Sequence, residues 1–161
     1  MKTKLTALAV LSSVLAAPAF AAGDAEAGAK VFNKCQTCHV VQNEAGEVLA
    51  GRNAKTGPNL YGIVGRTAGT YPEFAYGESI VALGASGFAW TEEDLNAYLV
   101  DPGKFLKEKS GDTKAKSKMV FKLGNETERA NVVAFLATFG GAAAAAPAEG
   151  EAAPAEGEAT N

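Results

Sequence analysis

Two cysteines and a histidine lie close together in the first quarter of the chain. Residues 35–39 read Cys-Gln-Thr-Cys-His, a C-x-x-C-H spacing, and the chain holds no other cysteine or histidine. In this spacing the two thiols can form thioether bonds to the two vinyl groups of a haem, while the adjoining imidazole coordinates the iron. We therefore predict one covalently bound haem c, attached at Cys35 and Cys38, with His39 as an iron ligand.

Two other interpretations of these residues are weaker. A disulfide between Cys35 and Cys38 would close a very short loop and remove little chain entropy, so it would be a redox device and not a staple. Such a device usually follows a strand in an alternating strand and helix pattern, which this sequence lacks. A closed zinc site needs four ligands, and two cysteines with one histidine leave it without a conventional fourth donor.

Counting ligand types identifies a second iron ligand. His39 is the only histidine, so two histidines of one chain cannot bind the iron, and Met119 is the only methionine besides Met1. A lone methionine is ordinarily a core filler, but Lys116 and Lys118 make the segment around Met119 unsuitable for a core helix or strand. We therefore expect His39 and Met119 to be the axial pair, which suits a carrier that stays six-coordinate.

The first residues have the features of an export signal. Lysines precede an apolar run over residues 5–15, and small residues flank Phe20. We predict a secretory signal peptide over residues 1–21, cleaved near Ala21 or Ala22, and a mature protein in the periplasm. An uncleaved membrane anchor is the alternative, but serines and a proline interrupt the run before it reaches the roughly 20 apolar residues that a span needs.

The last part of the chain has low complexity. Residues 140–161 are almost entirely Ala, Gly, Pro and Glu, and Ala-Pro-Ala-Glu-Gly-Glu-Ala occurs twice. Without large side chains to bury, this segment cannot offset the entropy of ordering, so we predict a disordered acidic tail. The remaining residues 22–139 form one predicted domain that is nearly neutral, with 13 basic against 14 acidic residues.

Three helices are predicted in this domain. Each begins at a residue whose side chain can accept a hydrogen bond from a free amide, and each has apolar residues on one side. They cover residues 24–34, 91–101 and 125–139, and a shorter helix is expected over residues 78–83. No alternating strand pattern of useful length is present. The expected fold class is all-α, with short helices and long loops wrapped around one haem.

Further motifs follow one another along the chain. They are Gly28 with Phe32, C-x-x-C-H, Lys55-Thr56-Gly57-Pro58-Asn59-Leu60, Gly65-Arg66, Trp90-Thr91, Tyr98-Leu99 and Lys118-Met119-Val120-Phe121. In these residues the chain resembles the class I cytochromes c, and among them the bacterial cytochrome c2 and cytochrome c550 group. The resemblance covers most of residues 23–139 and implies the class I cytochrome c fold.

The resemblance also implies roles around the haem. Pro58 is implied to offer its carbonyl to the Nδ1 proton of His39, which fixes the tautomer of the ligand. Arg66, Tyr76 and Trp90 are implied to be the donors around the haem propionates, whose buried charge needs compensation. Each assignment has a structural alternative: Pro58 is also a turn proline, and Trp90 alone would be a core residue.

Other implied roles concern the sixth ligand and the helix contact. Tyr98 is implied to lie near the methionine sulfur, and Phe121 beside the haem edge. Gly28, Phe32 and Phe135 are implied to form the contact between the first and last helices, which is a structural role only.

A concentration of lysines surrounds Met119. Residues 104–122 contain seven lysines against Glu108 and Asp112, an excess of five positive charges in a nearly neutral domain. A solvated charged loop is the simplest interpretation. With a haem nearby, we expect these lysines to surround the exposed haem edge and to give weak, salt-sensitive docking on acidic redox partners.

These features together imply an electron carrier and not an enzyme. A haem enzyme or gas sensor usually needs an open iron position and acid–base groups, but His39 is already a ligand. The resemblance implies a monomer that carries electrons from a quinol-oxidising, bc1-type membrane complex to an oxidase, reaction centre, peroxidase or nitrite reductase. This places it in respiration or photosynthesis, with no nucleic acid partner and no stable membrane insertion.

Overall fold

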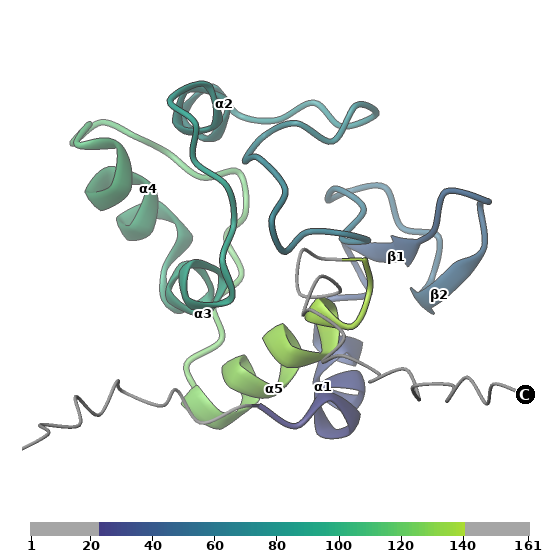
Figure 1. Cartoon of the computed structure of the whole chain (residues 1–161). Coiled ribbons are helices and arrows are strands. Elements are labelled where there is room, and N and C mark those ends of the chain that lie inside the picture. The colour runs from purple at the N-terminus through teal and green to yellow at the C-terminus, as the bar shows by residue number, and fades with distance from the viewer. Residues whose placement is uncertain (1–22, 141–161) are drawn as a thin grey trace, which may run out of the picture.

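The computed structural model describes residues 23–140, so the predicted leader and all of the predicted tail except Gly140 lie outside the described residues. Helices α2, α3 and α4 lie on one side of the molecule and a β-hairpin on the other, with α1 and α5 crossing next to both (Figure 1). In chain order the elements are α1 (Ala25–Val31), the 3-10 turn η1 (Phe32–Lys34), β1 (Val40–Gln42), β2 (Val48–Gly51), α2 (Glu78–Ala85), α3 (Glu92–Val100), α4 (Pro102–Ser110) and α5 (Glu126–Ala137). Within residues 23–140, every helix is too short or too polar to cross a membrane.

The predicted helices are present and begin at the predicted caps. Asp24, Thr91 and Asn125 each accept a hydrogen bond from a backbone amide two or three residues ahead, at 2.8, 3.0 and 3.0 Å respectively. These bonds satisfy amides that the first helical turn leaves without a partner. The helix ends differ slightly from the expectation, because the first helix tightens into a 3-10 turn at Phe32 and the last ends at Ala137.

A short β-hairpin was not predicted. Strands β1 and β2 pair antiparallel, with Val40 opposite Gly51 and a shift in register after Val41. The turn between them is closed by the Asn43 side chain, which accepts the Glu47 amide at 2.9 Å. Each strand has only three or four residues, too few for a recognisable alternation, so the turn chemistry around Asn43 was the available signal.

Helix α4 was also missed. The predicted second helix ends at residue 101 because proline follows it at position 102, but proline is equally well suited to the first position of a new helix. Asp101 caps this new helix by accepting the Lys104 amide at 3.0 Å, and Gly111 ends it with φ of 70°. Phe105 is buried beneath the helix at 5% exposure, so this part of the lysine-rich segment packs on the core.

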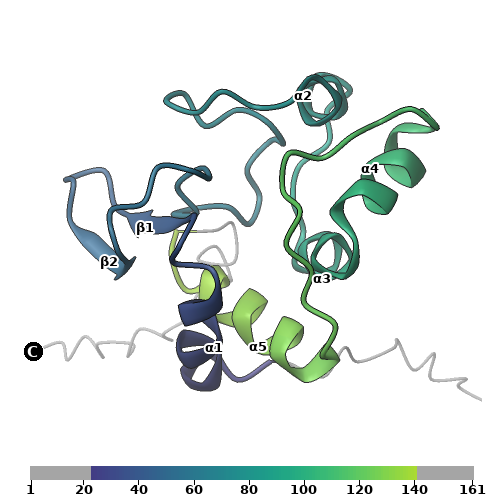
Figure 2. The same cartoon turned by 180° about the vertical axis from the view of Figure 1, so that it is seen from behind.

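The crossing of α1 and α5 joins the two ends of the domain (Figure 2). Gly28 lies at the closest approach, where an added Cβ would overlap the Asn131 carbonyl and come within 2.7 Å of the Phe135 Cβ. One turn further on, the rings of Phe32 and Phe135 pack with centroids 5.6 Å apart. The geometry agrees with the structural role implied for these residues, and it fixes the position of the turn that follows Phe32.

Candidate haem site

The C-x-x-C-H segment continues from η1 as a compact turn. The amides of Cys38 and His39 donate to the Cys35 carbonyl at 3.1 and 2.9 Å, which keeps both thiols and the imidazole within about one turn. Both thiols are free, Cys38 is exposed, and Cys35 is partly buried. Burial raises the pKa of the Cys35 thiol to about 11. Reactive dithiols have lowered thiol pKa values, so this environment argues against a dithiol oxidoreductase.

The His39 ring is held by the loop that contains Gly57 and Pro58. Its Nδ1 lies 2.9 Å from the Pro58 carbonyl oxygen, the contact that the resemblance implied. A Cβ on Gly57 would lie 2.5 Å from Cε1 of the ring, so the backbone at this position packs directly on the imidazole. The Gly57 amide donates to the Cys38 carbonyl at 2.7 Å, which fastens the loop to the C-x-x-C-H turn.

These contacts select one state of the imidazole. A carbonyl can only accept, so Nδ1 of His39 must carry the proton that it donates to Pro58, and Nε2 keeps its lone pair. Burial lowers the pKa of His39, and the hydrogen bond to Pro58 opposes this only in part. A neutral imidazole with a free Nε2 lone pair is the form that coordinates a metal.

The segment that carries Met119 is loop-like, as predicted, and is fastened to its surroundings by polar contacts. The Met119 amide donates to the Ser117 hydroxyl at 3.1 Å, and this hydroxyl lies 3.0 Å from the Tyr98 hydroxyl on α3. The Lys118 ammonium donates to the Ala75 carbonyl at 2.8 Å. Met119 itself is partly buried and packs against the core. Ser117 was not identified from the sequence as a supporting residue. Its position two residues before Met119 was the only signal that could have indicated this role.

Arg66 and Tyr76 lie near each other in the long segment between the hairpin and α2. The Arg66 guanidinium donates to the Asn59 carbonyl at 2.8 Å and to the Tyr61 carbonyl at 3.2 Å. Burial raises the pKa of Tyr76, and the positive charge of Arg66 partly opposes that rise. Tyr71 belongs to the same group, because its ring centroid lies 5.4 Å from the guanidinium carbon. It was not singled out in the sequence.

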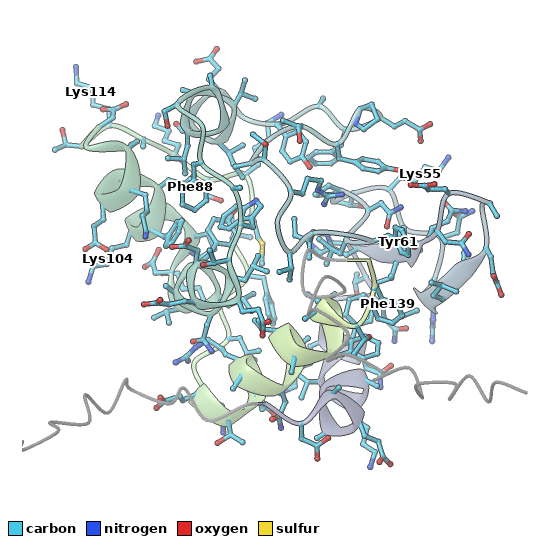
Figure 3. All side chains as sticks on the ribbon, in the orientation of Figure 1. Lys55, Tyr61, Phe88, Lys104, Lys114 and Phe139 are labelled. Carbon is cyan, nitrogen blue, oxygen red and sulfur yellow. The ribbon has the colours of Figure 1, made fainter. Side chains whose placement is uncertain are left out.

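Trp90 and Tyr98 belong to an aromatic cluster between α3 and α4. The Trp90 centroid lies 5.0 Å from Tyr98, 5.2 Å from Phe88 and 5.7 Å from Phe105. Figure 3 shows Phe88 at the boundary between this cluster and α2. Trp90 is only 4% exposed, whereas Phe121 is 37% exposed. Trp90 therefore packs as a core residue, and an indole N–H of such a residue needs a partner.

The residues present fit a haem. Within residues 23–140 no fully buried polar side-chain atom lacks a hydrogen-bond partner. Within the same residues, the Trp90 indole N–H and Nε2 of His39 make no hydrogen bond to another protein group. One needs an acceptor and the other offers a lone pair, and a haem supplies acceptor oxygens on its propionates and a coordination position on its iron. Two free thiols on the same turn as His39 complete the donor set.

The lysines of residues 104–122 divide into two groups. Lys109 and Lys122 form 2.6 Å ion pairs with Asp94 and Asp101, and these two acids reduce the local excess from five positive charges to three. Lys104 lies 3.6 Å from Glu108, and Lys118 is bonded to a carbonyl. Of the seven lysines in residues 104–122, Lys107, Lys114 and Lys116 have no such partner within the described residues.

A scan against models of known protein families gives no match. Comparison with known sequences does: cytochrome c2 of Rhodobacter capsulatus is 63% identical over 139 residues, which cover 86% of this chain and 98% of that protein. The chain belongs to the cytochrome c2 family. Within the same group, cytochrome c-550 of Paracoccus versutus is 46% identical over 155 residues, covering 92% of this chain and 99% of that protein.

Solved structures of cytochromes c2 and c-550 have the same fold. Cytochrome c2 from Rhodobacter sphaeroides matches with a TM-score of 0.71 at 58% identity, covering 73% of this chain and 96% of that one. Ferric cytochrome c-550 from Paracoccus versutus matches with a TM-score of 0.69 at 47% identity, covering 73% and 98%. The predicted class I cytochrome c fold is confirmed. As a member of the cytochrome c2 family, the chain is an electron carrier and not an enzyme, and it carries one covalent haem c.

Proposed function

We propose that the chain is a periplasmic one-electron carrier whose haem is attached at Cys35 and Cys38 and ligated by His39 and Met119. The observation that carries this proposal is the state of the only histidine, whose Nδ1 lies 2.9 Å from the Pro58 carbonyl while Nε2 remains unpartnered within the described residues. Met119 is the only methionine among those residues, and the contacts around it hold its segment in place.

Each of these residues has a distinct task. The haem supplies the one-electron couple of its iron, which a His/Met pair poises toward the reduced state. Pro58 orients the imidazole of His39 and increases its basicity, as second-shell acceptors do for ligating histidines. The Tyr98–Ser117 contact holds the backbone at Met119, so the thioether needs little reorganisation between the two oxidation states. No substrate and no proton transfer are required.

The remaining polar residues act on the haem periphery. Arg66, Tyr76 and Trp90 are proposed as the groups that compensate the propionates, with Trp90 offering an indole N–H that makes no hydrogen bond among the described residues. Arg66 already donates to two carbonyls, so its part is mainly that of a nearby positive charge. Phe121, whose side chain is 37% exposed, is proposed to cover the haem edge, the position that the resemblance implied.

The proposed partners are membrane redox complexes and periplasmic reductases. Electrons would come from a quinol-oxidising, bc1-type complex and pass to an oxidase, reaction centre, peroxidase or nitrite reductase. The proposed docking charges are the ammonium groups of Lys107, Lys114 and Lys116, which are unpaired within residues 23–140, and Figure 3 shows Lys114 pointing outward beyond the end of α4. Complementary charge raises the association rate more than the lifetime of a complex, which suits rapid turnover.

The outer parts of the chain complete the proposal. Residues 1–21 are proposed as an export signal cleaved near Ala21 or Ala22, residues 22–139 as the cytochrome domain, and residues 140–161 as an acidic, disordered tail. Export would place the carrier in the compartment where it meets these partners. A monomer is expected, without stable membrane insertion.

The ferric absorption spectrum tests the axial ligands. Methionine sulfur on ferric iron gives a weak far-red band, so the native protein is expected to show this band and Met119→Ala to lose it completely. Val120→Ala is the matched control, because Val120 is adjacent and 86% exposed and should leave the band unchanged. A native protein without the band, or a Met119→Ala protein that keeps it, would rule out Met119 as the ligand.

A further inference from the structure

The chain that follows Met119 is fastened to helix α3 and to the start of α4. The Lys122 ammonium lies 2.6 Å from Oδ2 of Asp101, at the junction of the two helices. The next residue, Leu123, donates its amide to the Leu99 carbonyl at 2.8 Å. These contacts begin only three residues after the proposed ligand, so they limit how far its segment can move.

A second fastening lies immediately beyond the first. The Arg129 guanidinium donates to the carbonyls of Leu123 and Gly124 at 2.9 and 2.8 Å, and to the Asn96 side chain at 3.1 Å. The Leu123 side chain is 4% exposed. The chain beyond residue 122 is therefore anchored on α3 and α5. Between Met119 and this anchored part, Lys122 is the residue whose side chain binds the segment to the helices.

Asp101 is a fixed point for that tie. It caps α4 by accepting the Lys104 amide at 3.0 Å, so the helix start holds its carboxylate in position independently of Lys122. The Lys122 hydrogen bond, together with the Lys104 amide, lowers the pKa of Asp101 below its usual range. Because this carboxylate is already held, forming the ion pair costs less side-chain entropy than forming an ordinary surface pair, in which two mobile side chains must be fixed.

We propose that Lys122 and Asp101 form a positioning clamp that holds the Met119 segment against the α3–α4 junction and disfavours replacement of the sulfur by an external ligand. This inference rests on the proposed ligation by Met119. The upstream side of the segment is held by the Tyr98–Ser117 contact, and the clamp supplies the matching side-chain restraint downstream. An external ligand can reach the sixth coordination position of the iron only when the Met119 segment moves away. The ion pair makes this movement less favourable, because the movement would stretch it.

Binding of neutral imidazole to the ferric protein tests the clamp. Imidazole is uncharged above its pKa, so removing a charge from the protein does not change the electrostatic attraction of imidazole to the site. Lys122→Gln removes the ammonium, and Asp101→Asn removes the carboxylate charge while keeping a good helix cap. Each variant is expected to bind imidazole about two- to fivefold more tightly, as loss of a partly exposed ion pair allows, and the double variant should show no further gain.

The control is Lys104→Gln, which removes the same charge from a weaker pair on α4, at 3.6 Å from Glu108. Its imidazole affinity should be unchanged. Unchanged affinity in both Lys122→Gln and Asp101→Asn, an equal gain in Lys104→Gln, or fully additive gains in the double variant would each overturn the clamp.

Hydrogen exchange at the Leu123 amide separates this proposal from the proposed ligation. The clamp predicts about two- to fivefold faster exchange of this amide in Lys122→Gln and not in Lys104→Gln. If the native protein lacks the far-red band, the proposed ligand is wrong, and the effect on the Leu123 amide alone decides whether the segment is clamped. Unchanged exchange at this amide would contradict the clamp whatever the spectrum shows.

Discussion

At the scale of single residues, the site depends on how closely backbone approaches the His39 ring. Pro58 determines which nitrogen carries the proton, and Gly57 determines where the ring lies. A hydrogen bond alone would leave the imidazole free to tilt about the Nδ1–oxygen axis. The backbone of Gly57 removes that freedom, so the residue before Pro58 positions the His39 ring as much as the carbonyl does.

Gly57→Ala is expected to displace the imidazole. The added Cβ would lie 2.5 Å from Cε1 of His39, far inside contact distance, and both groups are attached to constrained backbone. Unfolding of the haem protein in urea should show a loss of about 1–3 kcal/mol, the usual range for overpacking. Gly124→Ala is the control, since a Cβ there meets nothing within 4 Å. Equal stability of the two variants would show that Gly57 has no such role.

At the scale of the elements, the crossing of α1 and α5 positions the proposed haem attachment. The C-x-x-C-H turn starts from η1, so its location depends on how closely α1 can approach α5 at Gly28. The importance of Gly28 is steric: the residue lies in the interior of a helix, where glycine is intrinsically unfavourable by about 1 kcal/mol compared with alanine.

Opposite effects are therefore expected from the same substitution in two helices. Gly28→Ala should lower the free energy of unfolding by about 1–3 kcal/mol, because the new Cβ overlaps the Asn131 carbonyl. Gly103→Ala in α4 should raise it by about 0.4–1 kcal/mol, because its Cβ would make an ordinary 3.6 Å contact with Asp101. Urea titration of both variants measures the difference, and stabilisation by Gly28→Ala would contradict the close helix contact.

The elements also differ in how far sequence could predict them. The helices capped by Asp24, Thr91 and Asn125 were predicted because cap and apolar stripe are local signals. Helix α4 was missed because its start signals, Asp101 and Pro102, coincide with the end of α3. The hairpin was missed because strands of three and four residues are too short for a recognisable alternation, and the burial of Val41 under the rest of the domain is not a local signal.

At the scale of the whole molecule, charge is distributed unevenly, and the fold reduces the positive charge of the lysine-rich segment by pairing some of its lysines with acidic residues. The lysine-rich segment packs next to α3, whose acidic residues Asp94 and Asp101 pair with two of the lysines. Lys118 is directed to a backbone carbonyl beside the ligand segment. Neighbouring lysines in the sequence thus have different tasks, some holding the structure and others free to attract a partner.

Lys116→Glu is expected to slow electron transfer with an acidic redox partner. Its ammonium has no ion pair within the described residues, so reversing its charge acts on docking with little effect on the fold. Stopped-flow measurement with a quinol-oxidising complex should show a second-order rate about three- to tenfold lower at low ionic strength. The difference from the native protein should shrink as salt shortens the Debye length.

Lys30→Glu on α1 is the control, because it makes the same charge change on a helix well away from α4 (Figure 1). Its rate should stay close to that of the native protein. Rates that are independent of ionic strength, or equal slowing by both substitutions, would contradict docking through this face.

Sequence alone indicated the residues proposed to bind the haem and determined the starts of three helices. C-x-x-C-H, the single histidine and the lone downstream methionine are facts of composition and spacing, and a helix cap acts on amides two or three residues away. Only the tertiary structure decided how the proposed ligands are supported: Gly57 on the His39 ring, Ser117 between Tyr98 and Met119, and Lys122 on Asp101. These contacts join residues that are mostly 18 or more positions apart, so they exist only once the loops have packed.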